Sequence, residues 1–257
     1  MKIAFIGSGN LATHLSMALQ KSGADIIQVF SPTASHAKEL ADKLECMAVS
    51  DIADITTQAE VYILSIKDDA LPEVIQTICP RNPEALYIHT AGSIPMTVFE
   101  ANARRYGVLY PMQTFSKDRE VVFKKIPCFI EASDEISLKQ IRTLASAVSE
   151  HVVDADSHVR RKLHLAAVFA CNMANHCYRL AEKILEEDNI PFSLFLPLIE
   201  ETAHKVSELS PRDAQTGPMV RNDQKVMQRQ MQLINDPLAR QIYQLIAESI
   251  KEDRQHI

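Results

Sequence analysis

Glycine is scarce in this chain. An average composition of about 7% would place roughly 18 glycines in a protein of this size, and the 257 residues contain six glycines and 12 prolines. Such a composition excludes collagen-like and linker-rich chains and disfavours turn-dense all-β folds. Glycine is therefore kept at only a few positions, which are Gly7, Gly9, Gly23, Gly92, Gly107 and Gly217.

Other absences exclude several function classes. The net charge of −6 offers no basic footprint for nucleic acid. Five cysteines without a C-x-x-C pair argue against a disulfide framework or a metal site and indicate reduced thiols. The longest apolar run after the N-terminus, residues 165–171, is far shorter than the about 20 residues of a membrane span. Polar Ser8 and Asn10 interrupt the first apolar segment too soon for a signal peptide. We expect a soluble, cytoplasmic protein with no nucleic-acid or membrane partner.

The first 150 residues alternate short apolar runs with helical patterns. The candidate strands are residues 2–6, 26–30, 61–66, 85–89, 107–109, 128–131 and 151–153. The candidate helices are residues 11–21, 35–44, 71–78, 97–105 and 135–149. This order predicts an α/β fold with a doubly wound, mostly parallel sheet.

Strand signals stop after Asp156, and long helical patterns follow. The helices are expected to break near residues 189–191, 210–218 and 235–237, where Asn, Ser and Pro gather. We therefore predict two domains, a dinucleotide-binding (Rossmann) domain over residues 1–153 and an all-helical domain over residues 154–257.

The first strand runs into Gly7-Ser8-Gly9-Asn10-Leu11-Ala12 and then a helix. In a Gly-x-Gly-x-x-Ala turn, the first glycine allows the tight turn, the second lets a pyrophosphate approach the backbone, and the alanine allows close helix packing. Residues 7–11 are thus predicted to hold a diphosphate at the helix N-terminus. The alternative is a glycine turn that binds nothing. Gly23 lies where a helix C-cap is expected.

The second strand ends at Ser31-Pro32-Thr33 without the acidic residue that binds the ribose 2′-hydroxyl of NAD. Ser31 and Thr33 could hydrogen-bond a 2′-phosphate, and His36 or Lys38 could add positive charge. This favours NADP, with NAD as the alternative cofactor. The same residues are also compatible with simple capping of the next helix.

Ligands of doubly wound sheets bind at the carboxyl ends of the strands. We place Ile66, Lys67 and Thr90 among the cofactor-binding residues there. Asp68 or Asp69 could instead cap the following helix. His89 is predicted to line the site, and Gly92 to let the backbone approach a ligand. The segment that begins at Tyr110 could line the substrate side, and Gly107 is expected to be a turn residue.

A polar stripe follows the long helix predicted over residues 160–187. At 100° per residue, its members fall within an arc of about 80°; they are Arg161, His164, Asn172, Asn175 and Arg179. One interpretation pairs them with neighbouring helices or a second subunit, since unpaired buried polar groups cost on the order of 1–3 kcal/mol each. The other directs His164 and Asn172 into the site, as an acid–base group and an orienter of a carbonyl oxygen.

A second helical feature contains Thr216-Gly217-Pro218, Arg221 and Asp223. It is typical of a helix that opens at Pro218 with Thr216 as its cap. Arg221 could meet an anionic group, or Arg221 and Asp223 could form a weak salt bridge.

Together these motifs resemble the bacterial Rossmann-like NADP oxidoreductases with a C-terminal helical domain of unknown function. That family lies in the wider group of pyrroline-5-carboxylate reductase, ketopantoate reductase and 6-phosphogluconate dehydrogenase. The similarity runs nearly end to end, through residues 6–12, 67–70, 89–92, 110–115, 164–172 and 216–223. It implies a homodimer through the helical halves and an active site between the domains.

The resemblance also has departures. Many relatives carry an arginine where Pro32 follows Ser31. The wider group often places a lysine before an asparagine on the first long helix, whereas Lys162 lies off the stripe that holds His164 and Asn172. Some relatives of the N-terminal domain use a deazaflavin. The sequence thus predicts an NADP(H)-dependent oxidoreductase acting on a small carbonyl, imine or hydroxy metabolite, or alternatively a non-catalytic NADP-binding sensor or assembly protein on the same fold.

Overall fold

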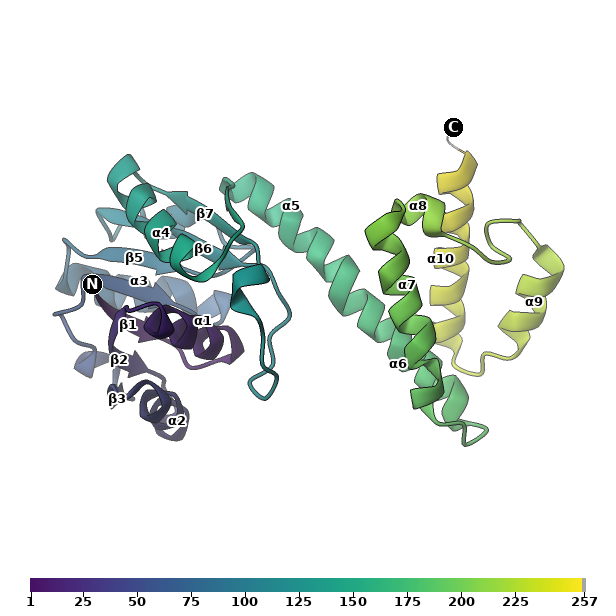
Figure 1. Cartoon of the computed structure of the whole chain (residues 1–257), viewed down its shortest axis with the longest axis horizontal. Helices are drawn as coiled ribbons and strands as arrows, with labels where there is room; N and C mark the ends of the chain where they lie inside the picture. Colours follow the sequence, from purple (N-terminus) through teal and green to yellow (C-terminus); the bar gives the residue numbers. More distant parts are fainter. Residues whose placement is uncertain (256–257) are drawn as a thin grey trace. The chain divides into compact units, whose positions relative to one another are not determined.

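The computed structural model describes residues 1–255 (Figure 1). The chain divides into two compact units, Met1–Cys171 and a second that begins at Asn172. Within the described residues, no helix has both the length and the apolar character that crossing a bilayer requires.

The first unit contains one eight-stranded sheet in the order β3-β2-β1-β4-β5-β6-β7-β8. Its strands are β1 (Lys2–Ile6), β2 (Asp25–Phe30), β3 (Met47–Val49), β4 (Val61–Leu64), β5 (Leu86–His89), β6 (Arg105–Pro111), β7 (Cys128–Ala132) and β8 (Val152–Asp154). All neighbouring pairs are parallel except β6 and β7. The predicted doubly wound, mostly parallel sheet is confirmed. Its strand order reverses at β1, where such folds bind ligands.

Helices cover both faces of this sheet (Figure 1). On one face lie α1 (Asn10–Lys21), α2 (Ala34–Leu44) and α4 (Glu135–Val148), and on the other α3 (Leu71–Ile78) and the short helix η4 (Met96–Phe99). Side chains along β1 alternate between the two cores, with Phe5 in one and Ile6 in the other. Because apolar side chains fill both faces of the sheet, a ligand can be bound only at the ends of the strands.

Some local elements differ from the prediction. The sequence predicts a helix over residues 97–105, but the chain makes only η4 and enters β6 at Arg105. Here the backbone N–H groups of Asn102 and Ala103 both donate to the carbonyl of Phe99, and Arg105 pairs with Leu86 in the sheet. Sheet pairing therefore overrides local helix propensity. The edge strand β3 was missed because it is defined by pairing with β2, which its own residues do not reveal. Gly107, which was expected in a turn, lies inside β6.

The helix α5 (Ser157–Ala167) belongs to the first compact unit. Leu163 packs against a cluster that contains Val108, Tyr110 and Phe129 of the sheet. The strands end at Asp154, close to the predicted domain boundary, but this packing extends the unit beyond it. This contact holds α5 against β6 and β7.

The second unit is helical. After the π-helical turn η6 (Val168–Met173), it contains α6 (Ala174–Glu186), α7 (Leu196–Glu208), α8 (Pro211–Ala214), α9 (Gln224–Gln232) and α10 (Pro237–Gln255). The predicted breaks at residues 189–191 and 235–237 fall between helices, whereas the predicted break at residues 210–218 contains the short helix α8. The predicted helix start at Pro218 was wrong, because residues 218–222 form turns and α9 begins at Gln224.

Candidate functional site

The strand-to-helix turn after β1 has the geometry predicted for Gly7 and Gly9. Gly7 has a φ of +116°, and a Cβ there would lie 2.2 Å from the carbonyl oxygen of Ser65. Only glycine fits this position. By contrast, a Cβ on Gly9 would meet nothing within 4 Å. Ala12, in the first turn of α1, is fully buried against the sheet. The turn is thus closed on the protein side and open at Gly9, as diphosphate binding requires.

The N-terminus of α1 supplies backbone donors to this opening. The N–H groups in the first turn of a helix have no intrahelical acceptor, and the helix dipole adds positive potential there. The N-cap residue is Gly9, so no capping side chain occupies these N–H groups. Ser8 is buried, and the amide side chain of Asn10 donates to the carbonyl of Phe115 at 2.8 Å. Of the predicted residues, Asn10 and Leu11 therefore offer an anion mainly their backbone N–H groups.

The carbonyl of Phe115 belongs to a segment that crosses α1. The ring of Phe115 stacks on His14, with centroids 5.5 Å apart, and His14 Nε2 lies 2.9 Å from the carbonyl of Ser116. The next residue, Lys117, forms an ion pair with Glu39 on α2. Residues 115–117 thus hold the start of α1 from the β6–β7 connection, and sequence spacing gave no signal for this contact.

The end of β2 places two hydroxyl groups near the expected adenosine position, of which only that of Thr33 is exposed. Ser31 is buried, and its backbone N–H donates to the carbonyl of Val49 at 3.1 Å. Thr33 is the N-cap of α2 by position, yet its side chain makes no cap hydrogen bond. Lys38 pairs with Asp42 on the same helix. Thr33 therefore caps α2 only through its backbone carbonyl, and its hydroxyl has no hydrogen-bond partner among the described residues.

The ends of β4 and β5 lie side by side. The backbone N–H of Thr90 donates to the carbonyl of Leu64 at 3.2 Å, and Thr90 is buried. Lys67 is exposed and precedes the short helix η2 (Asp68–Ala70). Asp68 accepts a hydrogen bond from the hydroxyl of Ser93 and caps no helix. These contacts tie the two strand-end loops together.

His89 lies in the core. Its side chain is fully buried and stacks on Phe99 with centroids 5.7 Å apart. Its Nδ1 accepts from the N–H of Ala91 at 3.2 Å, and Nε2 has no hydrogen-bond partner in the described chain. Burial, with a smaller effect from the Arg160 charge, lowers the pKa of His89 to about 3. A neutral, enclosed ring gives no support to a role in lining the substrate, which stays a prediction.

His164 of α5 lies directly over the loop that follows β5. A Cβ on Gly92 would lie 2.6 Å from Nδ1, 2.7 Å from Cγ and 2.9 Å from Cβ of His164. The close approach predicted for Gly92 is thus made by a side chain of the protein and not by a ligand. The Tyr110 hydroxyl, at the end of β6, lies 3.0 Å from the same Nδ1. Three segments that the sequence singled out separately therefore meet at one imidazole.

The two nitrogens of His164 differ in their surroundings. Nδ1 faces Gly92 and Tyr110, whereas the ring is only half-buried and Nε2 has no protein hydrogen bond within residues 1–255. Burial raises the pKa of Tyr110, which keeps its hydroxyl protonated. This hydroxyl can donate to Nδ1 of a neutral ring and accept from Nδ1–H of a charged one. Nε2 is the atom left to exchange a proton with a ligand.

Asn172 does not continue the stripe of His164. The spacing of 100° per residue applies to a regular α-helix, but residues 168–173 form a π-helical turn, which shifts the register. Asn172 is exposed and is the first residue of the second unit. Arg179 pairs with Glu182 and Glu186 on its own helix. The stripe is therefore not one surface, and the role of Asn172 stays a prediction.

The Asp223 carboxylate caps α9 by accepting from the N–H of Val226 at 3.2 Å. Arg221 is exposed and makes no ion pair within the described residues. The predicted salt bridge between them was wrong, because capping takes the carboxylate. Gly217 has a φ of +108° in the preceding turn.

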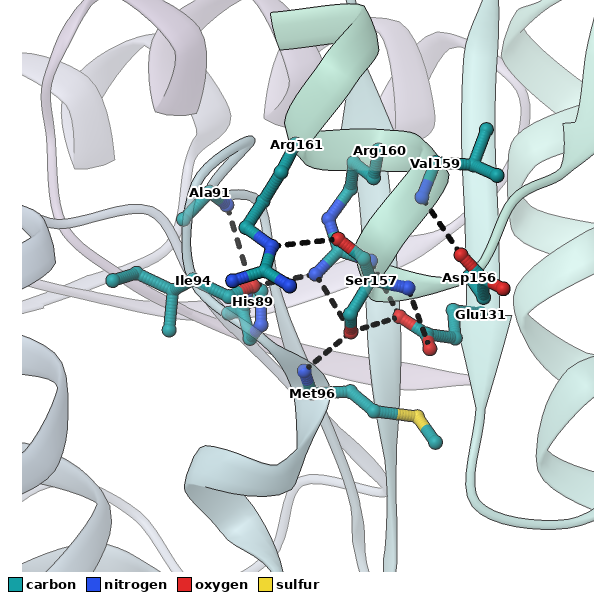
Figure 2. Close-up of polar contacts among 10 residues, drawn as sticks. All are labelled: His89, Ala91, Ile94, Met96, Glu131, Asp156, Ser157, Val159, Arg160 and Arg161. Atoms are coloured by element: carbon teal, nitrogen blue, oxygen red, sulfur yellow. Dashed lines mark hydrogen bonds and ion pairs between the residues drawn. The ribbon is translucent and has the colours of Figure 1, made fainter.

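Sequence reasoning missed a buried ion pair beside His164. Arg160 is fully buried and lies 2.5 Å from a carboxylate oxygen of Glu131 on β7 (Figure 2). The helical pattern contained Arg160 without marking it as internal, and Glu131 is 29 residues away. No local signal could have paired them.

Comparisons with known proteins identify the families that the two parts of the chain match. Residues 2–92 match the family described as NADP oxidoreductase, coenzyme F420-dependent, and residues 126–250 match a domain of unknown function, DUF2520. A Bacteroides fragilis protein that carries the provisional name NADP oxidoreductase is 49% identical over 98% of each chain, with a TM-score of 0.94.

Two further relatives are more distant. Pyrroline-5-carboxylate reductase of Pseudomonas aeruginosa is 33% identical over 103 residues, which are 39% of this chain and 38% of that enzyme. The imine reductase of Myxococcus stipitatus, solved with NADP+, is 16% identical, with a TM-score of 0.67 over 99% of this chain and 93% of that one. The latter likeness shows the fold.

Proposed function

The chain belongs to the family that joins an NADP oxidoreductase domain to the DUF2520 domain, and on this premise we propose that it moves a hydride between NADP(H) and a small carbonyl, imine or hydroxyl-bearing metabolite. The family agrees with the predicted cofactor, NADP. The observation that carries the proposal is the turn after β1, where Gly7 is closed against Ser65 and Gly9 is open.

The residues at the strand ends fit a dinucleotide. In the proposal, Gly7 to Leu11 hold the diphosphate through backbone N–H groups at the start of α1. Ser31 and the uncapped hydroxyl of Thr33 hold the adenosine ribose and its 2′-phosphate. Three more strand-end residues complete this proposed set: Ile66, Lys67 and Thr90.

His164 is the proposed acid–base group. When bound, NADPH supplies a hydride to the carbon of a C=O or C=N bond, and the bond's electron pair moves to oxygen or nitrogen. That atom then needs a proton, which Nε2 of His164 delivers while Tyr110 holds Nδ1. In the reverse direction the same nitrogen accepts the proton. The proposed role of Asn172 is to orient the substrate oxygen.

We also propose that the helical unit forms a homodimer. Of residues 172–254, only Ile234 and Ala247 are buried. Large apolar side chains are instead exposed, among them Leu194 at 67%, Leu233 at 71% and Leu245 at 66%. Such a surface without a core of its own is typical of an obligate interface.

Light scattering tests the dimer. Wild type should have twice the chain mass at micromolar concentration, and Leu245→Glu should shift it toward the monomer. Ile136→Glu, at a position 70% exposed on α4 of the first unit, serves as the matched control. A monomeric wild type would contradict the dimer proposal.

We also propose that the protein works in a reducing compartment such as the cytoplasm, because its five cysteines are all free thiols.

Calorimetric titration with NADPH and NADH tests cofactor binding. Because Gly9 has open space around it, Gly9→Val should fold as stably as wild type and yet lose NADPH binding. Retention of NADPH affinity by this variant would place the cofactor elsewhere. A panel of carbonyl and imine substrates then separates an enzyme from a sensor, since a sensor binds NADPH and turns over nothing.

A further inference from the structure

A buried charge cluster lies where α5 meets the sheet. Arg160 is 0% exposed and the Glu131 side chain is 12% exposed, and the guanidinium donates to the carboxylate at 2.5 Å (Figure 2). Neither residue has a role in the chemistry proposed above. The cluster therefore calls for its own explanation.

The Glu131 carboxylate also binds the first turn of α5. Its Oε1 accepts from the backbone N–H of Ser157 at 2.9 Å, and its Oε2 accepts from the Ser157 hydroxyl at 2.7 Å. A carboxylate at a helix N-terminus satisfies free N–H groups and complements the helix dipole. Glu131 thus binds α5 at two points: at Ser157 in the first turn of the helix and at Arg160 one turn later.

The same cluster also forms hydrogen bonds to the loop that contains Gly92. Arg160 donates to the carbonyl of Ile94 at 2.5 Å, and the Ser157 hydroxyl accepts from the N–H of Met96 at 3.1 Å (Figure 2). Strand β7, helix α5 and the loop after β5 are therefore joined at one point. The loop carries Gly92, and the helix carries His164.

Burying an arginine and a glutamate is a poor way to gain stability. Desolvation offsets most of the attraction between such charges, and apolar replacements of similar volume are often as stable. What the cluster does provide is fixed geometry. His164 follows Arg160 by four residues, so both lie on one face of α5. A slight rotation of the helix would drive the His164 ring into Gly92 or away from Tyr110.

We propose that Arg160 and Glu131 are positioning residues, which hold His164 between Gly92 and Tyr110 for proton transfer. This inference rests on the proposed function of His164. The two charged residues act through the placement of α5 and of the loop, and they contact neither substrate nor cofactor. Their loss should lower kcat without changing the affinity for NADPH.

The test uses the full chain with Arg160→Met and Glu131→Leu combined. These substitutions remove both charges and fill the same space with apolar side chains of similar volume. Nitrogen-15 NMR of the imidazole reports whether His164 Nδ1 still bonds to Tyr110. We expect this signature to disappear and kcat to fall about 10- to 100-fold, with an unchanged dissociation constant for NADPH. Arg161→Met is the matched control, because Arg161 is exposed and contacts only the Ser157 carbonyl among described residues.

A double variant that keeps the wild-type His164 signature and kcat would overturn the proposal. If that variant does not fold, Glu131→Gln keeps the size of the side chain and removes its charge, and the same two readouts decide. The NMR signature is independent of turnover. Should wild type turn over no substrate, the proposed function fails while the positioning of His164 is still measured.

Discussion

The hydroxyl of Tyr110 at the end of β6 lies 3.0 Å from Nδ1 of His164 on α5. The two residues are 54 positions apart in the sequence, and packing of Leu163 on the sheet brings them together. The hydroxyl can pair with the ring in both of its protonation states. His164 can therefore change its charge without losing this contact.

Removing this hydroxyl should impair turnover more than stability. Tyr110→Phe keeps the ring beside Phe129 but takes away the partner of Nδ1. We expect the free energy of unfolding to change by about 1 kcal/mol and kcat to fall about tenfold or more. Steady-state kinetics and urea unfolding measure the two effects. Tyr106→Phe, on the same strand, is the control and should leave kcat unchanged.

A side chain at Gly92 should displace His164. The added methyl group of Gly92→Ala would lie 2.6–2.9 Å from ring and Cβ atoms of His164, so we expect about 1–3 kcal/mol of destabilisation and loss of turnover. A double-mutant cycle identifies the cause. In the His164→Ala background, Gly92→Ala should cost clearly less stability. An equal cost in both backgrounds would show that the strain lies elsewhere.

An acidic residue at the end of β2 should reverse the cofactor preference. Ser31→Asp would repel a 2′-phosphate and could accept from a ribose 2′-hydroxyl. We expect NADPH to bind at least about tenfold more weakly, which equals about 1.4 kcal/mol, while NADH binding is kept or improved. Calorimetry with both cofactors measures this. Ser31→Asn adds the same bulk without charge, and an equal loss in that variant would argue against electrostatic discrimination.

His89 should make the fold sensitive to acid. Desolvation in the core, aided by the Arg160 charge, lowers the pKa of His89 from its usual 6.5 to about 3. The unfolded chain therefore takes up this proton first as the pH falls. The stability that the neutral ring provides is complete above pH 6.5 and is lost progressively as the pH falls toward 3.

Urea unfolding at pH 7 and pH 5 measures this effect. Between these values, His89 alone should cost wild type about 2 kcal/mol of unfolding free energy. His89→Phe retains a ring to stack on Phe99 and should lose about that much less over the same interval. Parallel pH dependence in the two proteins would refute the buried, neutral assignment.

Patterns within a single element predicted the fold well. The alternation of apolar runs with helices gave the parallel sheet, and the spacing of Gly7, Gly9 and Ala12 gave the turn after β1. These features depend on neighbours in sequence. The edge strand β3 and the start of β6 at Arg105 depend on pairing with other strands, and the sequence did not reveal them.

The site was predicted only in part for the same reason. Gly92, Tyr110 and His164 were each singled out, but their contact depends on how α5 packs on β6 and β7. The partnership of His164 with Asn172 assumed an unbroken α-helix, and the π-helical turn at residues 168–173 breaks that assumption. Glu131 and Arg160 pair across two elements, which no helical or strand period encodes.

NADPH oxidation by wild type and His164→Ala across a panel of small carbonyl and imine compounds tests the role of His164 most directly. We expect wild type to reduce at least one of these compounds. We also expect His164→Ala to lower kcat for that compound by about 10²- to 10⁴-fold with NADPH binding unchanged. Undiminished turnover in His164→Ala, or NADPH binding by wild type with no turnover of any compound, would contradict this assignment.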